Sequence, residues 1–250
     1  MIEASKSSWF DRVFYYYNLH YLLRRHFHYA GFQGMLDPYP NRGILYVMNH
    51  SSWWDGLIAY HVFHSCSYGD HYVMMDEQQL RNYRFFRKMG AYSINKSSPA
   101  HMIPSLRYTV SLLQSGKRVW MYPQGDIHHL EHRPLEVMGG AAHVLRKAPD
   151  TVVIPVTAYY SMYQHQKPEV TLMAGSPLEG PWNSASKEDI TDRLQQTLQR
   201  QLDSHKRRII YGEPLPASDF LSMLPAGKST DQTFLTFKEK VSRWKSFLGS

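Results

Sequence analysis

The chain is organised around residues 44–55, which read ILYVMNHSSWWD. The five apolar residues at its start predict a buried strand, and the run from Gly56 to His64 predicts a helix soon after it. His50 and Asp55 therefore stand where a strand ends and a helix begins. In open α/β sheets this is a common position for reactive groups.

The spacing of His50 and Asp55 limits how their side chains can meet. On a regular helix two residues five apart point about 140° away from each other. The side chains can meet only if His50 lies in the turn and Asp55 in the first helical turn, with Ser51 or Ser52 as the N-cap. Asp55 would then hold one ring nitrogen of His50 and leave the other to accept a proton. The alternative is a plain helix cap, in which Asp55 only stabilises the positive helix end.

Strands and helices alternate through the rest of the chain. Apolar runs predict strands at 72–75, 91–94, 118–122, 152–157 and 170–174, and helical patterns lie at 77–90, 98–114, 139–147 and 186–206. This order indicates a layered α/β fold with a mixed, mostly parallel central sheet flanked by helices. We expect one domain at 34–215, between an N-terminal aromatic and basic segment (1–33) and a basic amphipathic tail (216–250).

Charge and aromatic content indicate an anionic partner. The 250 residues carry a formal charge of +7 and 14% aromatic residues, a composition that suits a nucleic acid, a phosphorylated ligand or an anionic membrane surface. Residues 9–32 place aromatic side chains beside Arg24 and Arg25, which predicts an amphipathic helix in the membrane interface; a helix packed on the domain is the alternative. Without an apolar run of 18 residues or a signal-peptide pattern, we expect a peripheral, monotopic protein on the cytoplasmic face of a membrane.

Two other classes are disfavoured. Cys66 is the single cysteine, so neither an internal disulfide nor a CxxC zinc site can form. A histidine-rich loop offers metal ligands at spacings that match no zinc signature, so we expect no metal; its members are His128, His129 and His132 with Asp126 or Glu131. No motif that reads DNA or RNA is present, so we expect no nucleic-acid partner.

Four segments stand in a recognisable order: NHSSWWD at 49–55, GAYSINK at 90–96, YPQGD at 122–126 and VIPV at 153–156. Together they resemble the glycerolipid and lysophospholipid acyltransferase family, typified by bacterial 1-acylglycerol-3-phosphate acyltransferase, over roughly residues 43–156. The resemblance implies transfer of a fatty acyl group from a thioester of coenzyme A or acyl carrier protein to a lipid hydroxyl, without a further cofactor. It implies His50 as the general base, oriented by Asp55.

The sequence departs from the family pattern where the acceptor is expected to bind. The third motif usually reads aromatic-Pro-Glu-Gly-Thr-Arg, but here Gln124 replaces the glutamate, Asp126 the threonine and Ile127 the arginine associated with the acceptor phosphate. The second motif ends in Lys96 instead of arginine, which keeps the charge but loses bidentate binding. We therefore expect a weakened site for the acceptor phosphate.

Three readings of the acceptor side remain open. A lysophosphatidate-like glycerolipid would be held by Lys96 and Arg133, whereas the sugar of an unphosphorylated glycolipid or glycosylated carotenoid would be bound by Gln124 and Asp126. A catalytically degenerate lipid-binding protein is the third reading, and the retained His50 and Asp55 argue against it. Backbone amides around Gly125 are the expected oxyanion donors. The expected acceptor-binding residues are Lys96, Gln124, Gly125, Asp126 and Arg133.

Overall fold

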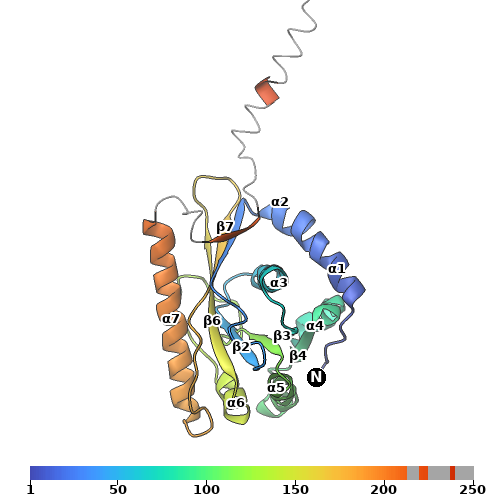
Figure 1. Cartoon of the computed structure of the whole chain (residues 1–250), viewed down its shortest axis with the longest axis vertical. Helices are drawn as coiled ribbons and strands as arrows, with labels where there is room; N and C mark the ends of the chain where they lie inside the picture. The colour runs from blue at the N-terminus through green and yellow to red at the C-terminus, as the bar shows by residue number, and fades with distance from the viewer. Residues whose placement is uncertain (213–219, 225–236, 240–250) are drawn as a thin grey trace, which may run out of the picture.

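The computed structural model describes residues 1–212, 220–224 and 237–239 (Figure 1). Within them, one sheet has the strand order β4-β3-β5-β2-β6-β7-β1-β8. Its strands are β1 (Tyr29–Gln33), β2 (Ile44–Met48), β3 (His71–Asp76), β4 (Ala91–Ile94), β5 (Arg118–Met121), β6 (Val152–Ser161), β7 (Glu169–Ala174) and β8 (Leu221–Leu224). Only the β6–β7 and β1–β8 neighbours are antiparallel among these described strands, which confirms the mixed, mostly parallel sheet.

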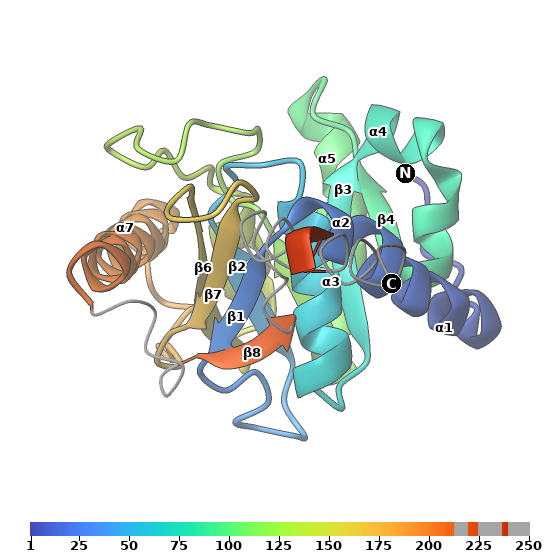
Figure 2. The same cartoon turned by 90° about the horizontal axis from the view of Figure 1, so that it is seen from above.

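Helices cover both faces of this sheet (Figure 2). One face carries α3 (Asp55–Cys66) and the N-terminal helices α1 (Ser8–Tyr17), η1 (Asn18–Leu23) and α2 (Arg24–His26). The other carries α5 (Pro99–Gln114), α6 (Gly140–Lys147) and α7 (Lys187–Tyr211). The short helices α4 (Glu77–Asn82) and η2 (Arg84–Met89) follow β3. The expected helix at 77–90 is thus in two parts, and Gly90 ends the second in a left-handed conformation with φ +100°.

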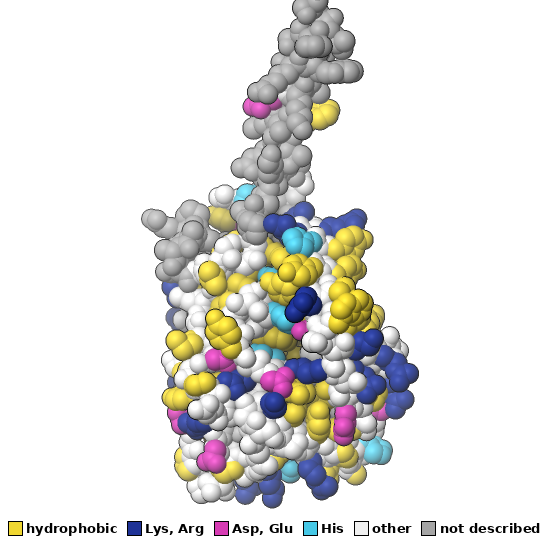
Figure 3. All heavy atoms as spheres, turned by 45° about the vertical axis from the view of Figure 1, so that its right-hand side comes forward, with side chains coloured by type: hydrophobic (Ala, Val, Ile, Leu, Met, Phe, Trp, Pro, Cys, Tyr) yellow, Lys and Arg dark blue, Asp and Glu magenta, His cyan; other side chains and the backbone are white. Residues whose placement is uncertain are grey.

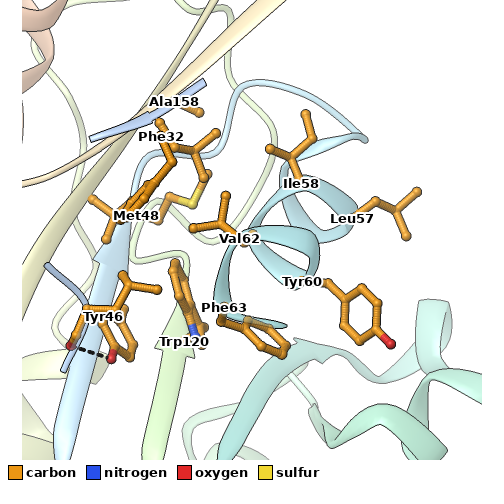
Figure 4. Close-up of a cluster of buried hydrophobic side chains, with 14 of the residues drawn as sticks. Phe32, Tyr46, Met48, Leu57, Ile58, Tyr60, Val62, Phe63, Trp120 and Ala158 are labelled. Atoms are coloured by element: carbon orange, nitrogen blue, oxygen red, sulfur yellow. Dashed lines mark hydrogen bonds between the residues drawn. The ribbon is translucent and has the colours of Figure 1, made fainter. Parts of the chain in front are cut away.

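Strand β2 lies at the centre of the sheet and is buried on both faces. Its residues Tyr46 and Met48 belong to the cluster under α3, whereas Leu45 and Val47 belong to the cluster under α5 and α6. Figure 4 shows the first cluster, in which the Tyr46 ring stacks on Trp120 with 4.3 Å between ring centroids. This two-sided burial explains the unbroken apolar run that marks β2 in the sequence.

The N-terminal segment differs from the expected single helix at 9–32. Phe27 is already extended, and Tyr29–Gln33 forms β1, which pairs parallel with β7 and antiparallel with β8. Hydrogen bonds to two neighbouring strands satisfy the backbone of Tyr29–Gln33, and this pairing outweighs the helical pattern of the local sequence. The sheet therefore extends beyond residues 34–215 on both sides. The division at 33 and 215 stays a prediction, and most of the expected tail lies outside the described residues.

Helix α1 buries one aromatic side chain, Phe14, packs Phe10 and Tyr15 partly against the core, and exposes others. Phe14 is buried against Phe85 and Tyr60, with ring centroids 5.7 and 5.5 Å away. Val13 and Tyr17 of the same helix are exposed. In the described part of the chain, no helix has both the length and the apolarity needed to span a bilayer.

Candidate active site

The side chain of Asn49 fixes the loop that leaves β2. Its Oδ1 accepts a hydrogen bond from the Ala158 amide at 2.8 Å, and its Nδ2 donates to the Ala158 carbonyl at 3.1 Å. Asn49 is buried, and its side chain makes the two hydrogen bonds to β6 that a further strand residue would make with its backbone. The chain is therefore held against β6 for one residue after β2 ends. His50 follows directly and is thereby placed at the carboxyl end of the central strands.

His50 and Asp55 meet as the sequence geometry requires. The Nδ1 atom of His50 lies 2.8 Å from Oδ2 of Asp55, the first residue of α3. The same oxygen accepts hydrogen bonds from the backbone amides of Ser51 at 2.8 Å and Ser52 at 2.9 Å. The Asp55 side chain is 0% exposed and that of His50 is 22% exposed. A buried carboxylate thus holds an imidazole that remains accessible.

The expected N-cap is wrong. Trp54 occupies the N-cap position of α3 without a side-chain hydrogen bond, and Ser52 instead accepts from the Trp54 amide at 3.2 Å. The Asp55 carboxylate also does not cap its own helix, because it binds amides of the turn before the helix. Asp55 therefore organises the His50 turn, and the plain capping interpretation does not describe it.

Tyr160 is a member of the site that the sequence did not reveal. It lies near the end of β6, and its hydroxyl donates to Asp55 Oδ1 at 2.5 Å. Burial, followed by the negative charge of Asp55, raises the pKa of Tyr160 well above its ordinary value, so the hydroxyl keeps its proton at neutral pH. Both carboxylate oxygens of Asp55 are consequently held, one by Tyr160 and the other by His50 and the turn amides.

Removing this hydroxyl tests whether Tyr160 positions the pair. Hydrogen bonds to charged groups contribute about 1.5–3 kcal/mol, so we expect Tyr160→Phe to lower kcat by roughly tenfold with little change in KM. Tyr159→Phe is the matched control, because its hydroxyl contacts Glu131 instead. Steady-state kinetics of both variants check this, and an equal loss in the two would contradict a positioning role for Tyr160.

The third motif forms a tight turn against His50. The Gly125 amide donates to the Tyr122 carbonyl at 3.0 Å, and Gly125 adopts a φ of +81°, which favours glycine. Oε1 of Gln124 accepts from the His50 amide at 2.8 Å. Gln124 is buried, so it supports the His50 backbone and does not line the cavity described next. Gly125 does line the cavity, but its amide is used within the turn. The acceptor and oxyanion roles expected of Gln124 and Gly125 stay predictions.

A cavity of about 900 Å³ opens beside His50. Its volume lies at the upper end of the range for ligand sites. Much of its wall is apolar and comes from α3, β3, η2 and α5. The apolar lining includes Leu57, Tyr60, Val73, Met74, Phe86, Met89, Met102 and Leu106. An extended hydrocarbon chain fits such a lining.

The cationic side chains expected at the acceptor are already engaged. Lys96 lines the cavity, but its Nζ donates to Asp126 Oδ1 at 2.6 Å and to the Gly125 carbonyl at 2.9 Å. The hydrogen bond from Lys96 holds the pKa of Asp126 below its ordinary value, so Asp126 is ionised at neutral pH. Arg133 is not among the cavity-lining residues; its guanidinium contacts Asp203 at 2.7 Å.

The α/β sheet thus presents a histidine–carboxylate pair beside a largely apolar cavity. A family model described as Acyltransferase matches residues 25–159, more than half of the chain. The chain therefore belongs to the Acyltransferase family, which implies an acyl donor and an acceptor.

The fold is also found in a solved structure. The 1-acyl-sn-glycerophosphate acyltransferase PlsC from Thermotoga maritima superposes with a TM-score of 0.51 at 16% sequence identity, covering 72% of this chain and 73% of that one. At this identity the likeness supports the fold alone. A comparison with curated proteins gave no significant match.

Proposed function

We propose that the protein transfers a fatty acyl group from an acyl thioester to a lipid hydroxyl, with His50 as the general base. The observation that carries this proposal is the 2.8 Å contact between His50 Nδ1 and the buried Asp55 carboxylate. A carboxylate can only accept, so Nδ1 is the protonated nitrogen and Nε2 is left to take a proton. His50 also lines the cavity, where substrates can reach it.

The proposed reaction needs no nucleophile from the protein. His50 Nε2 removes the proton of the acceptor hydroxyl while its oxygen attacks the thioester carbonyl carbon. The tetrahedral oxyanion then collapses, the carbon–sulfur bond breaks, and the imidazolium returns the proton to the leaving thiolate. Asp55 stabilises the imidazolium in between. Because the Gly125 amide is used within its turn, the backbone amides of Asp126 and Ile127 are the better candidates for oxyanion donors.

The first candidate acceptor is a lysophosphatidate-like glycerolipid, the substrate named for the Thermotoga maritima protein. The second is an unphosphorylated sugar hydroxyl, as in a glycolipid or glycosylated carotenoid. The pairing of Lys96 with Asp126 favours this second acceptor, because a phosphate would meet an ionised carboxylate and a cation that is already neutralised.

Thiol release from palmitoyl-coenzyme A, with palmitoyl-acyl carrier protein as a parallel donor, tests the proposal. Lysophosphatidate and a lipid glycoside serve as separate acceptors. We expect release that depends on an acceptor, with the glycoside preferred. Release that no acceptor stimulates, from either donor, would contradict acyl transfer to a lipid hydroxyl.

Restoring the missing arginine tests the acceptor assignment. Ile127 is 52% exposed and lines the cavity. We expect Ile127→Arg to raise kcat/KM for lysophosphatidate by roughly tenfold, as one charge-assisted contact would, and to leave the glycoside unaffected. Ile103→Arg is the matched control, since Ile103 also lines the cavity and is 44% exposed. Unchanged acceptor preference in Ile127→Arg would count against a phosphate site lost at this position.

We further propose that the N-terminal helices rest on the cytoplasmic face of a membrane. Aromatic side chains are exposed at Trp9, Tyr16, Tyr17 and Tyr21, and Arg24 and Arg25 follow on the same segment, also exposed. Figure 3 shows hydrophobic and basic side chains interspersed on this side of the molecule. Such a surface combines interfacial aromatic anchors with attraction to anionic headgroups.

Charge reversal on this segment tests the membrane proposal. Each basic side chain near an anionic membrane contributes about 1 kcal/mol, so we expect Arg24→Glu/Arg25→Glu to weaken binding to anionic vesicles by at least about tenfold. Vesicle co-sedimentation measures this. The control is Arg146→Glu/Lys147→Glu, which makes the same change in net charge at the end of α6. Equal binding by the two double variants would show that the N-terminal segment does not direct the interaction.

A further inference from the structure

Three potential metal ligands meet outside the active site, where the β6–β7 hairpin reaches the start of β1. They are His28, just before β1; His165, in the hairpin loop; and Glu169, the first residue of β7. One ligand atom of each lies within 4.8 Å of the others. The two imidazole rings face each other, with 3.5 Å between their centroids.

The backbone holds two of these ligands in place. The His28 amide donates to the Pro168 carbonyl at 2.9 Å, and the next residue, Tyr29, pairs with Glu169 in the parallel β1–β7 ladder. Lys167 in the hairpin also donates to the Arg24 carbonyl at 3.1 Å. The arrangement thus joins the N-terminal helices to the hairpin, two segments far apart in the sequence that Figure 1 shows close together.

The ligand atoms lack the partners that buried polar groups normally have. Nδ1 of His165 is buried without a hydrogen bond. Glu169 is 6% exposed, and within the described residues no hydrogen bond or ion pair reaches its carboxylate. Buried polar groups of native proteins are almost always satisfied, so the unpaired Nδ1 of His165 requires an explanation.

The donor set suits a cation, because the cluster combines two imidazoles with the carboxylate of Glu169, a residue that is only 6% exposed. Lys167 opposes a cation, but its ammonium is directed to the Arg24 carbonyl. A bound divalent ion would supply the positive charge that the Glu169 carboxylate lacks.

We propose that His28, His165 and Glu169 bind a divalent transition-metal ion, Zn²⁺ in the first instance, that ties the β6–β7 hairpin to the N-terminal segment. Two imidazoles and one carboxylate are a common zinc ligand set, with water in the fourth position. Zinc–nitrogen distances of about 2.0–2.1 Å require tetrahedral ligand atoms roughly 3.4 Å apart. His165 lies in a half-exposed loop, so rotation of its ring can close the remaining gap.

A second set of histidines provides the matched control. The loop after β5 carries His128 and His129, and there the polar groups already have partners. Nδ1 of His129 accepts from the Glu131 amide at 3.2 Å, and the Glu131 carboxylate is paired with Lys206. We expect these side chains to bind Zn²⁺ only weakly, as isolated surface imidazoles do.

Zn²⁺ titration of the chelator-treated full chain by calorimetry tests the proposal. We expect one tight site per chain, with Kd raised about 100-fold or more by His165→Gln and by Glu169→Gln, since even outer-shell losses cost 10–100-fold. His129→Gln should bind like the wild type. Zn²⁺ should raise the Tm of the wild type and His129→Gln, but not of His165→Gln.

The reverse pattern would overturn the metal site. If the wild type binds Zn²⁺ no more tightly than His165→Gln, or if His129→Gln loses the same affinity, the cluster is not the site. Because His165 lies on the hairpin surface, its variant is expected to fold. The Tm measured without metal verifies this and keeps a binding loss distinct from misfolding.

Discussion

His50→Ala is expected to lower kcat for acyl transfer by about 10²- to 10⁴-fold. The imidazole is the group placed to take the acceptor proton, because Asp55 holds its Nδ1 and the ring lines the cavity. His50 is partly exposed and its backbone is held by Gln124 independently of the ring, so the variant should fold. Steady-state kinetics, together with the Tm, separate lost chemistry from lost structure.

The matched control for this variant is His64→Ala. His64 forms the same kind of pair with a carboxylate, its Nε2 lying 2.7 Å from Asp11 Oδ2, but it is not among the cavity-lining residues. We expect wild-type turnover from His64→Ala. If His50→Ala also keeps its turnover, the pair at 50 and 55 is structural, and a different base or a lipid-binding role replaces the proposed mechanism.

Asp55→Asn is the second variant with a large expected effect, about 10³- to 10⁴-fold in kcat, as for the corresponding change in the serine-protease triad. Asp55 accepts hydrogen bonds from His50, Tyr160 and the amides of Ser51 and Ser52. An asparagine presents an NH₂ group to some of these donors, so it cannot satisfy them all and favours the wrong His50 tautomer.

The kinetic pattern distinguishes this role from general destabilisation. We expect Asp55→Asn to lower kcat far more than it changes KM, because the Asp55 side chain is 0% exposed and is not among the cavity-lining residues. Asp11→Asn, which alters the exposed carboxylate beside His64, serves as the control and should keep kcat. A loss confined to KM in Asp55→Asn would contradict the orienting role.

The parts of the fold that the sequence predicted are those with strong local signals. The apolar runs of β2 and β6 and the Ser98-Pro99 start of α5 all correspond to observed elements. Strands β1 and β8 were missed because they owe their conformation to each other and to β7. The aromatic pattern of residues 9–32 predicted a helix as far as Phe32. Pairing with the distant strand β7 instead makes the last part of this segment a strand.

The site shows the same division between local and distant information. His50 and Asp55 lie five residues apart, so their meeting could be derived from helix geometry. Tyr160 contacts Asp55 across 105 residues, and nothing in the local sequence marks it. The role of Arg133 could not be judged either, because only the folded chain brings Asp203 to its guanidinium.

The most direct test of the central claim follows a labelled acyl chain. Purified protein is incubated with ¹³C-palmitoyl-coenzyme A and each acceptor, and the lipids are analysed by mass spectrometry alongside His50→Ala. The account predicts a labelled ester on the acceptor hydroxyl with the wild type and none above background with the variant. Labelled ester formed equally by both proteins would contradict a mechanism that depends on His50.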